Sequence, residues 1–261
     1  MNKRPEQHFN SVSEWLDFNS KLATDDPYDQ GPAWNGKLKR DDILKRARYG
    51  DLSLMDQVNA LTEKLHLPDT EGKEWISSVS GPIFCIPEVI AGYPENARRL
   101  DISESERAPI RIFVNPFLSA GVTLEQGLKR GITIAALASR LQMTHPVELV
   151  LVAAHGTRGG KDPSSIWNLI TVNIGVLPID MSVLAFLLAR PEVYRRLMLP
   201  VSHDMGMSSW DSSAAGPEAI KSKLGLTEHD LYIGALVLGD KLMTSPIEWI
   251  NEQVERFNKG E

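Results

Sequence analysis

Residues 109–154 constrain the fold more than any other part of the sequence. They hold an alternating run at 110–114, a long amphipathic segment, and a nearly all-apolar run at 146–154. Alternation is typical of a strand buried mainly on one face, and a short apolar run is typical of a central strand buried on both faces. The order strand, loop, helix, strand predicts an α/β or α+β fold, in which helices flank a mixed β-sheet.

The amphipathic segment has the features of a helix that packs closely on its neighbour. Thr123 and Gln126 have the spacing of a capping box at its start. Gly127, Gly131 and Ala135 then recur every four residues and form a ridge of small side chains. Because glycine lowers helix stability, we expect this ridge to lie against the sheet at close range.

We expect a single α/β domain over residues 36–261, preceded by an N-terminal arm over residues 1–35. The arm holds one short helical run and a loop dense in turn-forming residues. Residues 36–68 predict a helical subregion, in which Asp41 caps the first helix, Gly50 ends it and Pro68 ends the second. Further strands are expected at 166–174 and 231–240, and helices at 180–190, 191–198 and 247–259.

Composition narrows the class of protein. Of the 261 residues 42% are hydrophobic and 24% charged, which are ordinary values for a globular chain. The net charge of −6 argues against a surface that is basic throughout, but it allows a local basic groove. Cys85 is the only cysteine, so an internal disulfide and a cysteine-based zinc site are excluded. No signal peptide or apolar run of about 18 residues is present, so we expect a soluble protein of a reducing compartment.

The loop after the first strand lacks the residues of a metal site. The strand, loop and helix loosely resemble the opening of a von Willebrand factor A domain, whose metal site needs an Asp-x-Ser-x-Ser pattern. Here Asn115 replaces the aspartate, and only Ser119 remains of the pattern. Divalent cations of this kind require carboxylate oxygens. We therefore predict a scaffold with no metal and no cofactor.

The run 156–161, Gly-Thr-Arg-Gly-Gly-Lys, is similar to a P-loop but does not match it. Its first glycine is one residue too close to the Gly-Lys pair, and Asp162 stands where the motif has serine or threonine. Two interpretations stay open. The loop either offers Arg158, Lys161 and glycine N–H groups to an anion, or it is an ordinary solvated loop.

The sequence contains the residue types of a hydrolase triad but no motif that would bring them together. His155, His203 and Asp204 would have to meet Ser119, which lacks the Gly-x-Ser-x-Gly elbow of a nucleophilic serine. We predict that the protein is not an enzyme, with an unrecognised nuclease or hydrolase as an alternative.

A basic run is the strongest remaining signal. Between residues 37 and 48 six basic and two acidic side chains give a net charge of +4, and aromatic residues flank the run. Phosphates attract such charge, and exposed rings stack unpaired bases at about 1–3 kcal/mol each. The alternative is a solvated helix whose charges match its dipole. Paired basics elsewhere, such as Lys129-Arg130 and Arg195-Arg196, are expected at the surface. The predicted nucleic-acid-binding residues are Trp34, Lys37, Lys39, Arg40, Lys45, Arg46, Arg48, Tyr49, Arg158 and Lys161.

Several segments together resemble a family of uncharacterised bacteriophage proteins. They are the tryptophan–glycine and basic element at 34–52, the Ala-Gly-Tyr-Pro-Glu-Asn motif at 91–96, and the Arg-Gly-Ile-Thr-Ile helix at 130–134, and the likeness spans residues 34–200. Within that family the chain is similar to the single-stranded DNA-binding RNA polymerase cofactors of podoviruses that package a virion RNA polymerase.

The resemblance implies a function. It implies binding of single-stranded DNA, recruitment of the phage-encoded RNA polymerase to promoters, an early role in infection and a place in the host cytoplasm. Two linked sites would raise avidity for a flexible strand, so we expect a homo-oligomer. The alternative outside this class is a metal-free, von Willebrand A-like adaptor that touches a protein partner near Ser119 and residues 203–210.

Overall fold

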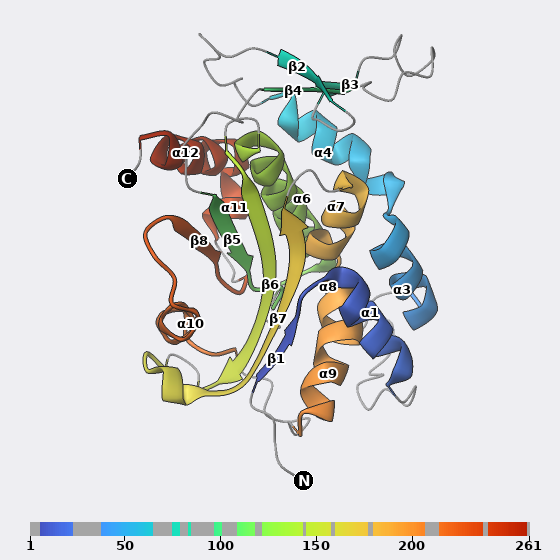
Figure 1. The fold of residues 1–261 in the computed structure, drawn as a ribbon, viewed down its shortest axis with the longest axis vertical. Helices are drawn as coiled ribbons and strands as arrows, with labels where there is room; N and C mark the ends of the chain where they lie inside the picture. Colours follow the sequence, from blue (N-terminus) through green and yellow to red (C-terminus); the bar gives the residue numbers. More distant parts are fainter. Residues whose placement is uncertain are drawn as a thin grey trace.

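A computed structural model of the chain has an α/β fold built on a five-stranded mixed sheet (Figure 1). The strands lie in the order β1-β7-β6-β5-β8, and their bounds are Glu6–Phe9 for β1, Ile110–Val114 for β5, Val147–Gly156 for β6, Ile166–Val176 for β7 and Asp230–Ile233 for β8. β5 is parallel to β6 and β8, β1 is parallel to β7, and β6 and β7 are antiparallel. The predicted fold class is confirmed. The structure describes residues 6–22, 38–64, 75–78, 83–84, 97–100, 109–117, 122–142, 145–157, 160–176, 180–206, 214–236 and 240–259.

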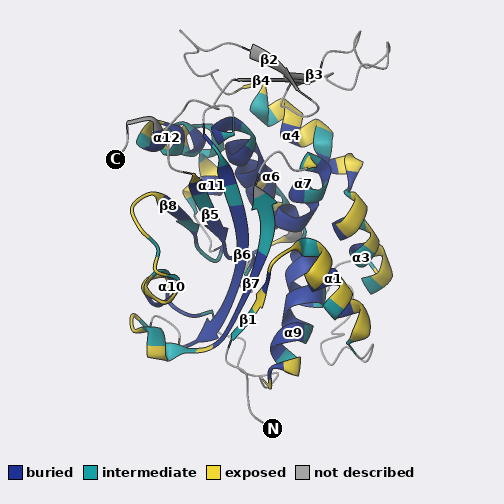
Figure 2. Cartoon of the chain, viewed as in Figure 1, coloured by how far each residue is buried: buried dark blue, intermediate teal, exposed yellow. Residues whose placement is uncertain are grey.

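Most of the core lies between one face of this sheet and a layer of helices. Ile112, Leu149 and Ile170 of the sheet pack there with side chains such as Leu137 and Phe186. The layer contains α6 (Leu124–Leu141), α7 (Met181–Ala189), and a continuous helical run made of α8 (Pro191–Val193), the π-helix η3 (Tyr194–Met198) and α9 (Leu199–Asp204). In Figure 2 the central strands and these helices are mostly buried, whereas the edge strand β1 and the ends of β7 are partly exposed.

The opposite face of the sheet carries a smaller core. Phe113, Val150 and Val152 pack there with Ile220 of α10 (Pro217–Leu224). β5 is therefore buried on both faces, whereas its alternating sequence predicts burial mainly on one. Phe113 makes the difference, because it fills the second core while Ile112 fills the first. At the end of the chain, α11 (Lys241–Thr244) and α12 (Pro246–Lys259) contact α6.

The expected N-terminal arm contributes to the domain itself. β1 adds to the sheet as an edge strand beside β7, with Phe9 opposite Val172. α1 (Val12–Lys21) begins at a Ser11 cap and buries Trp15 and Leu16 completely. Residues 6–22 thus form part of the fold rather than an arm. The reason is that β7 offers an open strand edge, and the tryptophan and leucine are large apolar groups whose burial stabilises the fold.

The helical subregion is confirmed within the described residues, with one correction. It consists of α3 (Arg40–Tyr49), η1 (Leu52–Leu54) and α4 (Met55–Thr62). Gly50 ends α3 with a φ of 84°, as its position predicts. The cap of α3 is Lys39, whose side chain forms no capping hydrogen bond, so the prediction that Asp41 caps this helix is wrong. Pro68 lies outside the described residues.

The helix α6 shows both the predicted cap and a correction. Thr123 and Gln126 form the expected capping box. The small-residue ridge, however, faces a helix rather than the sheet, since a Cβ placed on Gly131 would lie 2.2 Å from the Cα of Ala189 in α7. Glycine here allows two helix backbones to approach each other.

Several elements were not predicted, among them a small sheet and a short 3-10 helix. A three-stranded antiparallel sheet has the order β2-β4-β3, with bounds Trp75–Ser78, Ala97–Leu100 and Ile83–Phe84. A 3-10 helix, η2 (Pro163–Ser165), lies in the β6–β7 connection. No helix within the described ranges is long and apolar enough to cross a membrane.

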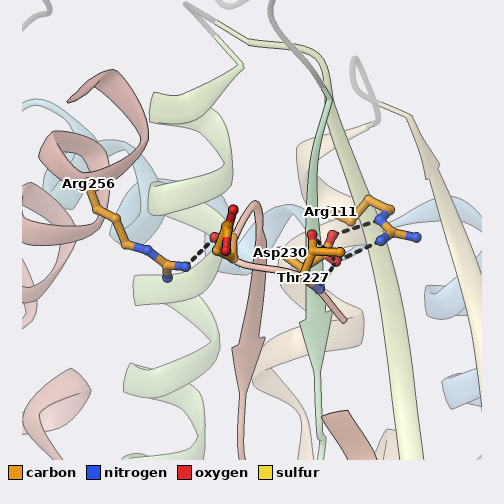
Figure 3. A network of polar contacts seen from close by, with 5 residues as sticks. Arg111, Thr227, Asp230 and Arg256 are labelled. Carbon is orange, nitrogen blue, oxygen red and sulfur yellow. Dashed lines mark hydrogen bonds and ion pairs between the residues drawn. The ribbon is translucent and has the colours of Figure 1, made fainter. Parts of the chain in front are cut away.

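A charged network joins the beginnings of β5 and β8 (Figure 3). Arg111 donates two hydrogen bonds of 2.7 Å to the carboxylate of Asp230, which also accepts from the N–H and the hydroxyl of Thr227. Burial acts to raise the pKa of Asp230, but the hydrogen bonds from Arg111 and Thr227 outweigh it and lower the pKa. The bidentate pair fixes the register of two parallel strands that are far apart in the sequence.

Candidate functional site

Six of the predicted nucleic-acid-binding residues lie on α3 or at its cap. They are Lys39, Arg40, Lys45, Arg46, Arg48 and Tyr49. Ile43 and Ala47 form the buried face of this helix, which contacts α1 and α7. The opposite face is open to solvent (Figure 2). Trp34, Lys37 and Arg158 lie outside the described residues.

The three arginines of α3 bind neighbouring groups of the protein. Arg40 donates to the backbone carbonyl of Asn19 at 2.5 Å, Arg46 lies 2.7 Å from the carboxylate of Asp51, and Arg48 lies 2.5 Å from Asp17. They therefore hold α3 to α1 and to the segment that follows it. Much of the positive charge of the run is offset by acidic neighbours, which sequence order alone does not show.

Asp51 is the buried centre of this arrangement. It accepts hydrogen bonds from the N–H and hydroxyl of Ser53 and from Arg46, and Arg190 lies 3.5 Å away. Burial acts to raise the pKa of Asp51, whereas the bonds from Ser53 and Arg46 lower it and prevail. Arg46 consequently serves the fold, and it is a poor choice for a phosphate contact.

Lys39, Lys45 and Tyr49 remain available for a ligand. Both lysines are exposed, and neither forms an ion pair with any residue that the structure describes. The side chain of Tyr49 is 71% exposed and lies one helical turn after Lys45, on the same face of α3. An ammonium group beside an open phenol ring can bind a phosphate and stack a base.

Lys161 lies in a different part of the molecule. It is exposed in the β6–β7 connection, whose 3-10 helix η2 contacts α10, whereas α3 contacts α1 and α7 (Figure 1). The structure thus does not bring the two predicted groups of basic residues together. The N–H of Gly160 donates to the carbonyl of Thr157 at 2.9 Å, so this glycine does not offer its N–H to an anion as one interpretation required.

Trp167 is an exposed residue that sequence reasoning missed. Its side chain is 50% exposed at the start of β7, close to Lys161 in the sequence. Strand propensity placed it in a strand without indicating which face it occupies. A large aromatic residue directly after a polar loop was the available signal.

The residue in place of the metal-binding aspartate shapes a turn. Asn115 is buried, its Oδ1 accepts the N–H of Phe117 at 2.9 Å, and its Nδ2 donates to the Tyr232 hydroxyl at 3.3 Å. Among the residues that the structure describes, no group of three or more histidine, cysteine or acidic side chains could hold a metal ion.

His155 contacts a serine other than the one considered for a triad. It is fully buried near the end of β6, where its Nε2 lies 3.2 Å from the hydroxyl of Ser202. Its ring stacks near Tyr194 and meets Phe117 edge-on. No residue that the structure describes hydrogen-bonds its Nδ1, so within the described part of the chain the pair lacks the acid that orients a catalytic histidine. Ser119 lies outside the described residues.

We expect acid to destabilise the fold through His155. Burial lowers its pKa to about 4 from the usual 6.5. Between pH 4 and pH 6.5 the unfolded chain binds a proton at this histidine that the folded chain does not. The contribution of the neutral His155 ring to stability is therefore present above pH 6.5 and is lost as the pH falls toward 4. The free energy of unfolding should fall by about 2 kcal/mol between pH 7 and pH 5 from this group alone.

Urea unfolding at several pH values measures this effect. The variant His155→Gln should show a smaller pH dependence than the wild type over this window. The variant His229→Gln changes an exposed histidine and should keep the wild-type slope. Equal slopes for the wild type and His155→Gln would contradict the role of His155.

The fold and these sites define an α/β domain with a mixed sheet and an open helical face. The chain belongs to a family described as a domain of unknown function, DUF7192, whose model matches residues 2–260. No curated protein and no solved structure matches it.

Proposed function

We propose that the protein binds single-stranded DNA and acts as a transcription cofactor that recruits a phage-encoded RNA polymerase to promoters. One structural observation supports the binding step: Lys45 and the 71%-exposed ring of Tyr49 lie together on the open face of α3. The resemblance to bacteriophage proteins supports the finer statements, which are the polymerase partner, an early role in the host cytoplasm and a homo-oligomer.

Single strands fit this surface better than duplex DNA does. The phenol ring can stack only on a base whose face is open, whereas the lysines can contact the phosphates of either form. The patch is narrow because Arg40, Arg46 and Arg48 bind groups of the protein itself. We therefore expect modest affinity per site that weakens with salt.

Replacing Lys39, Lys45 and Tyr49 together by alanine should weaken binding of single-stranded DNA by about 10- to 100-fold. The arginines stay in place because their loss would detach α3 from its neighbours. Fluorescence anisotropy with a labelled oligo-dT measures the change, and circular dichroism checks the fold. The variant Lys64→Ala/Lys129→Ala removes two exposed lysines, one shortly after α4 and one on α6, and should bind like the wild type. Equal affinity of the triple variant and the wild type would refute this site.

A protein-interaction adaptor is the second candidate. The observation in its favour is that Leu52, which is 79% exposed, follows Tyr49 closely and extends the apolar part of the patch. Substitution of Leu52 by alanine would weaken a protein contact there but should leave DNA affinity intact. Cleavage of single-stranded DNA by the purified protein with Mg²⁺ or Mn²⁺ would favour the nuclease alternative instead.

A further inference from the structure

The two longest strands continue beyond their neighbours as a two-stranded ribbon. β5 pairs with β6 only as far as Leu151, and β1 pairs with β7 only from Leu169 onward. Beyond both neighbours the ribbon is short: His155 pairs with Asn168 and Gly156 with Ile166, and His155 also bridges Ala214. The outer end of this ribbon carries the 157–165 connection.

A β-bulge turns Trp167 outward at the end of this ribbon. His155 pairs with Asn168 and Gly156 pairs with Ile166, so Trp167 is the extra residue between two register positions. A bulge breaks the regular alternation of a strand and redirects a side chain. Gly156 allows the tight geometry, because a Cβ there would lie 2.3 Å from the carbonyl oxygen of Ser165.

The connection beside Trp167 is held by its own hydrogen bonds. The N–H of Thr157 donates to the carbonyl of Ser165 at 3.0 Å, and the N–H of Ser165 donates to the carbonyl of Asp162 at 3.0 Å. The side chain of Asp162 also caps η2 by accepting the N–H of Ser164 at 2.7 Å. The indole therefore follows a hydrogen-bonded turn at residues 162–165, and a support of this kind lowers the entropy lost on binding.

The surroundings of Trp167 indicate the kind of partner. Among the described residues of the connection, the exposed ones are Thr157, Lys161, Asp162 and Ser164, which are polar or charged. The other large apolar side chains that are exposed within the described ranges are Tyr49 and Leu52, at α3 and η1. A protein interface surrounds an aromatic anchor with further apolar surface, whereas a single ring with a lysine six positions away in the same connection suits a base and a phosphate of the same strand.

We propose that Trp167 stacks an unpaired base and that Lys161 contacts an adjacent phosphate, so that the ribbon end is a second contact for single-stranded nucleic acid. This inference rests on the proposed function. Because α3 contacts α1 and α7 while η2 contacts α10, the ribbon end is separate from the α3 patch. The two contacts would engage different parts of one strand, or two strands.

The test uses the full chain with Trp167→Ala and the matched variant Trp167→Phe. The probe is a fluorescein-labelled oligo-dT of about 16 nucleotides, a length that a single binding module can cover. Loss of one stacked base should weaken binding by about 5- to 100-fold in the alanine variant. The phenylalanine variant keeps an aromatic face and should retain most of the affinity, and binding of duplex DNA should not change.

Cross-linking gives a readout that a merely structural role would not change. Irradiation with an oligonucleotide that carries bromodeoxyuridine should link the peptide containing Trp167. If Trp167→Ala binds single strands as tightly as the wild type and no cross-link forms at this peptide, the inference is wrong and the proposed function still stands. A wild type that binds no single-stranded DNA would overturn both.

Discussion

Replacing Arg130 by alanine is expected to lower the free energy of unfolding by about 3–5 kcal/mol. The arginine reaches from α6 to the ends of two parallel strands, where its Nη2 donates to the carbonyls of Asn115 at 3.0 Å and Gly234 at 2.5 Å. It is only 1% exposed. Alanine would leave buried carbonyls without a donor and would open a cavity in their place.

Arg130 stabilises the fold through its hydrogen bonds, but burying its charge costs free energy. Desolvation lowers its pKa to about 10, so it still carries a charge at neutral pH with carbonyl oxygens as its hydrogen-bond partners. Methionine keeps most of the volume without the buried charge, so Arg130→Met should cost less than Arg130→Ala. Both variants remove the Arg130 hydrogen bonds to the carbonyls, but only Arg130→Ala also opens a large cavity. Comparing them therefore separates the cost of the cavity from the cost of the lost hydrogen bonds.

Urea unfolding followed by circular dichroism measures both variants. The control is Lys129→Ala, which changes an exposed neighbour and should alter stability by less than about 0.5 kcal/mol. The contrast also corrects an expectation, since Lys129 and Arg130 were predicted to lie together at the surface. Consecutive helix residues point in different directions, and Arg130 points inward. Equal losses from Lys129→Ala and Arg130→Ala would contradict the stabilising role of the Arg130 hydrogen bonds.

Local patterns predicted the elements whose signals are contained within a few residues. The capping box of α6, the Gly50 terminus of α3 and the apolar run of β6 were all correct for this reason. β1 was missed because Glu-Gln-His-Phe has no apolar alternation. It becomes a strand through its pairing with β7, which is distant in the sequence.

The candidate site was predictable only in part for the same physical reason. Residue types located the basic helix, but only the structure shows that Lys45 and Tyr49 share its exposed face. The ion pairs of Arg48 with Asp17 and of Arg46 with Asp51 depend on tertiary contacts, so the sequence overstated the free charge. The outward turn of Trp167 depends on the register between β6 and β7, which no local pattern contains.

The approach of α6 to α7 has a direct test. Gly131→Ala is expected to cost about 3 kcal/mol or more, although alanine stabilises an isolated helix by about 1 kcal/mol relative to glycine. The added Cβ would lie 2.2 Å from the Cα and 2.3 Å from the N of Ala189, and 2.4 Å from the carbonyl carbon of Leu188. These are backbone atoms, so no side chain can rotate away and the two helices must separate.

The double variant Gly131→Ala/Ala189→Gly distinguishes a backbone collision from a crowded side chain. Removing the methyl group of Ala189 leaves its Cα and N in place, so this change should not restore the stability lost in Gly131→Ala. The change Ala189→Gly alone should cost about 1 kcal/mol, and the two losses should add. Thermal or urea unfolding of the four proteins gives the coupling energy. Rescue in the double variant would show that side-chain packing, rather than contact between backbones, makes glycine necessary at position 131.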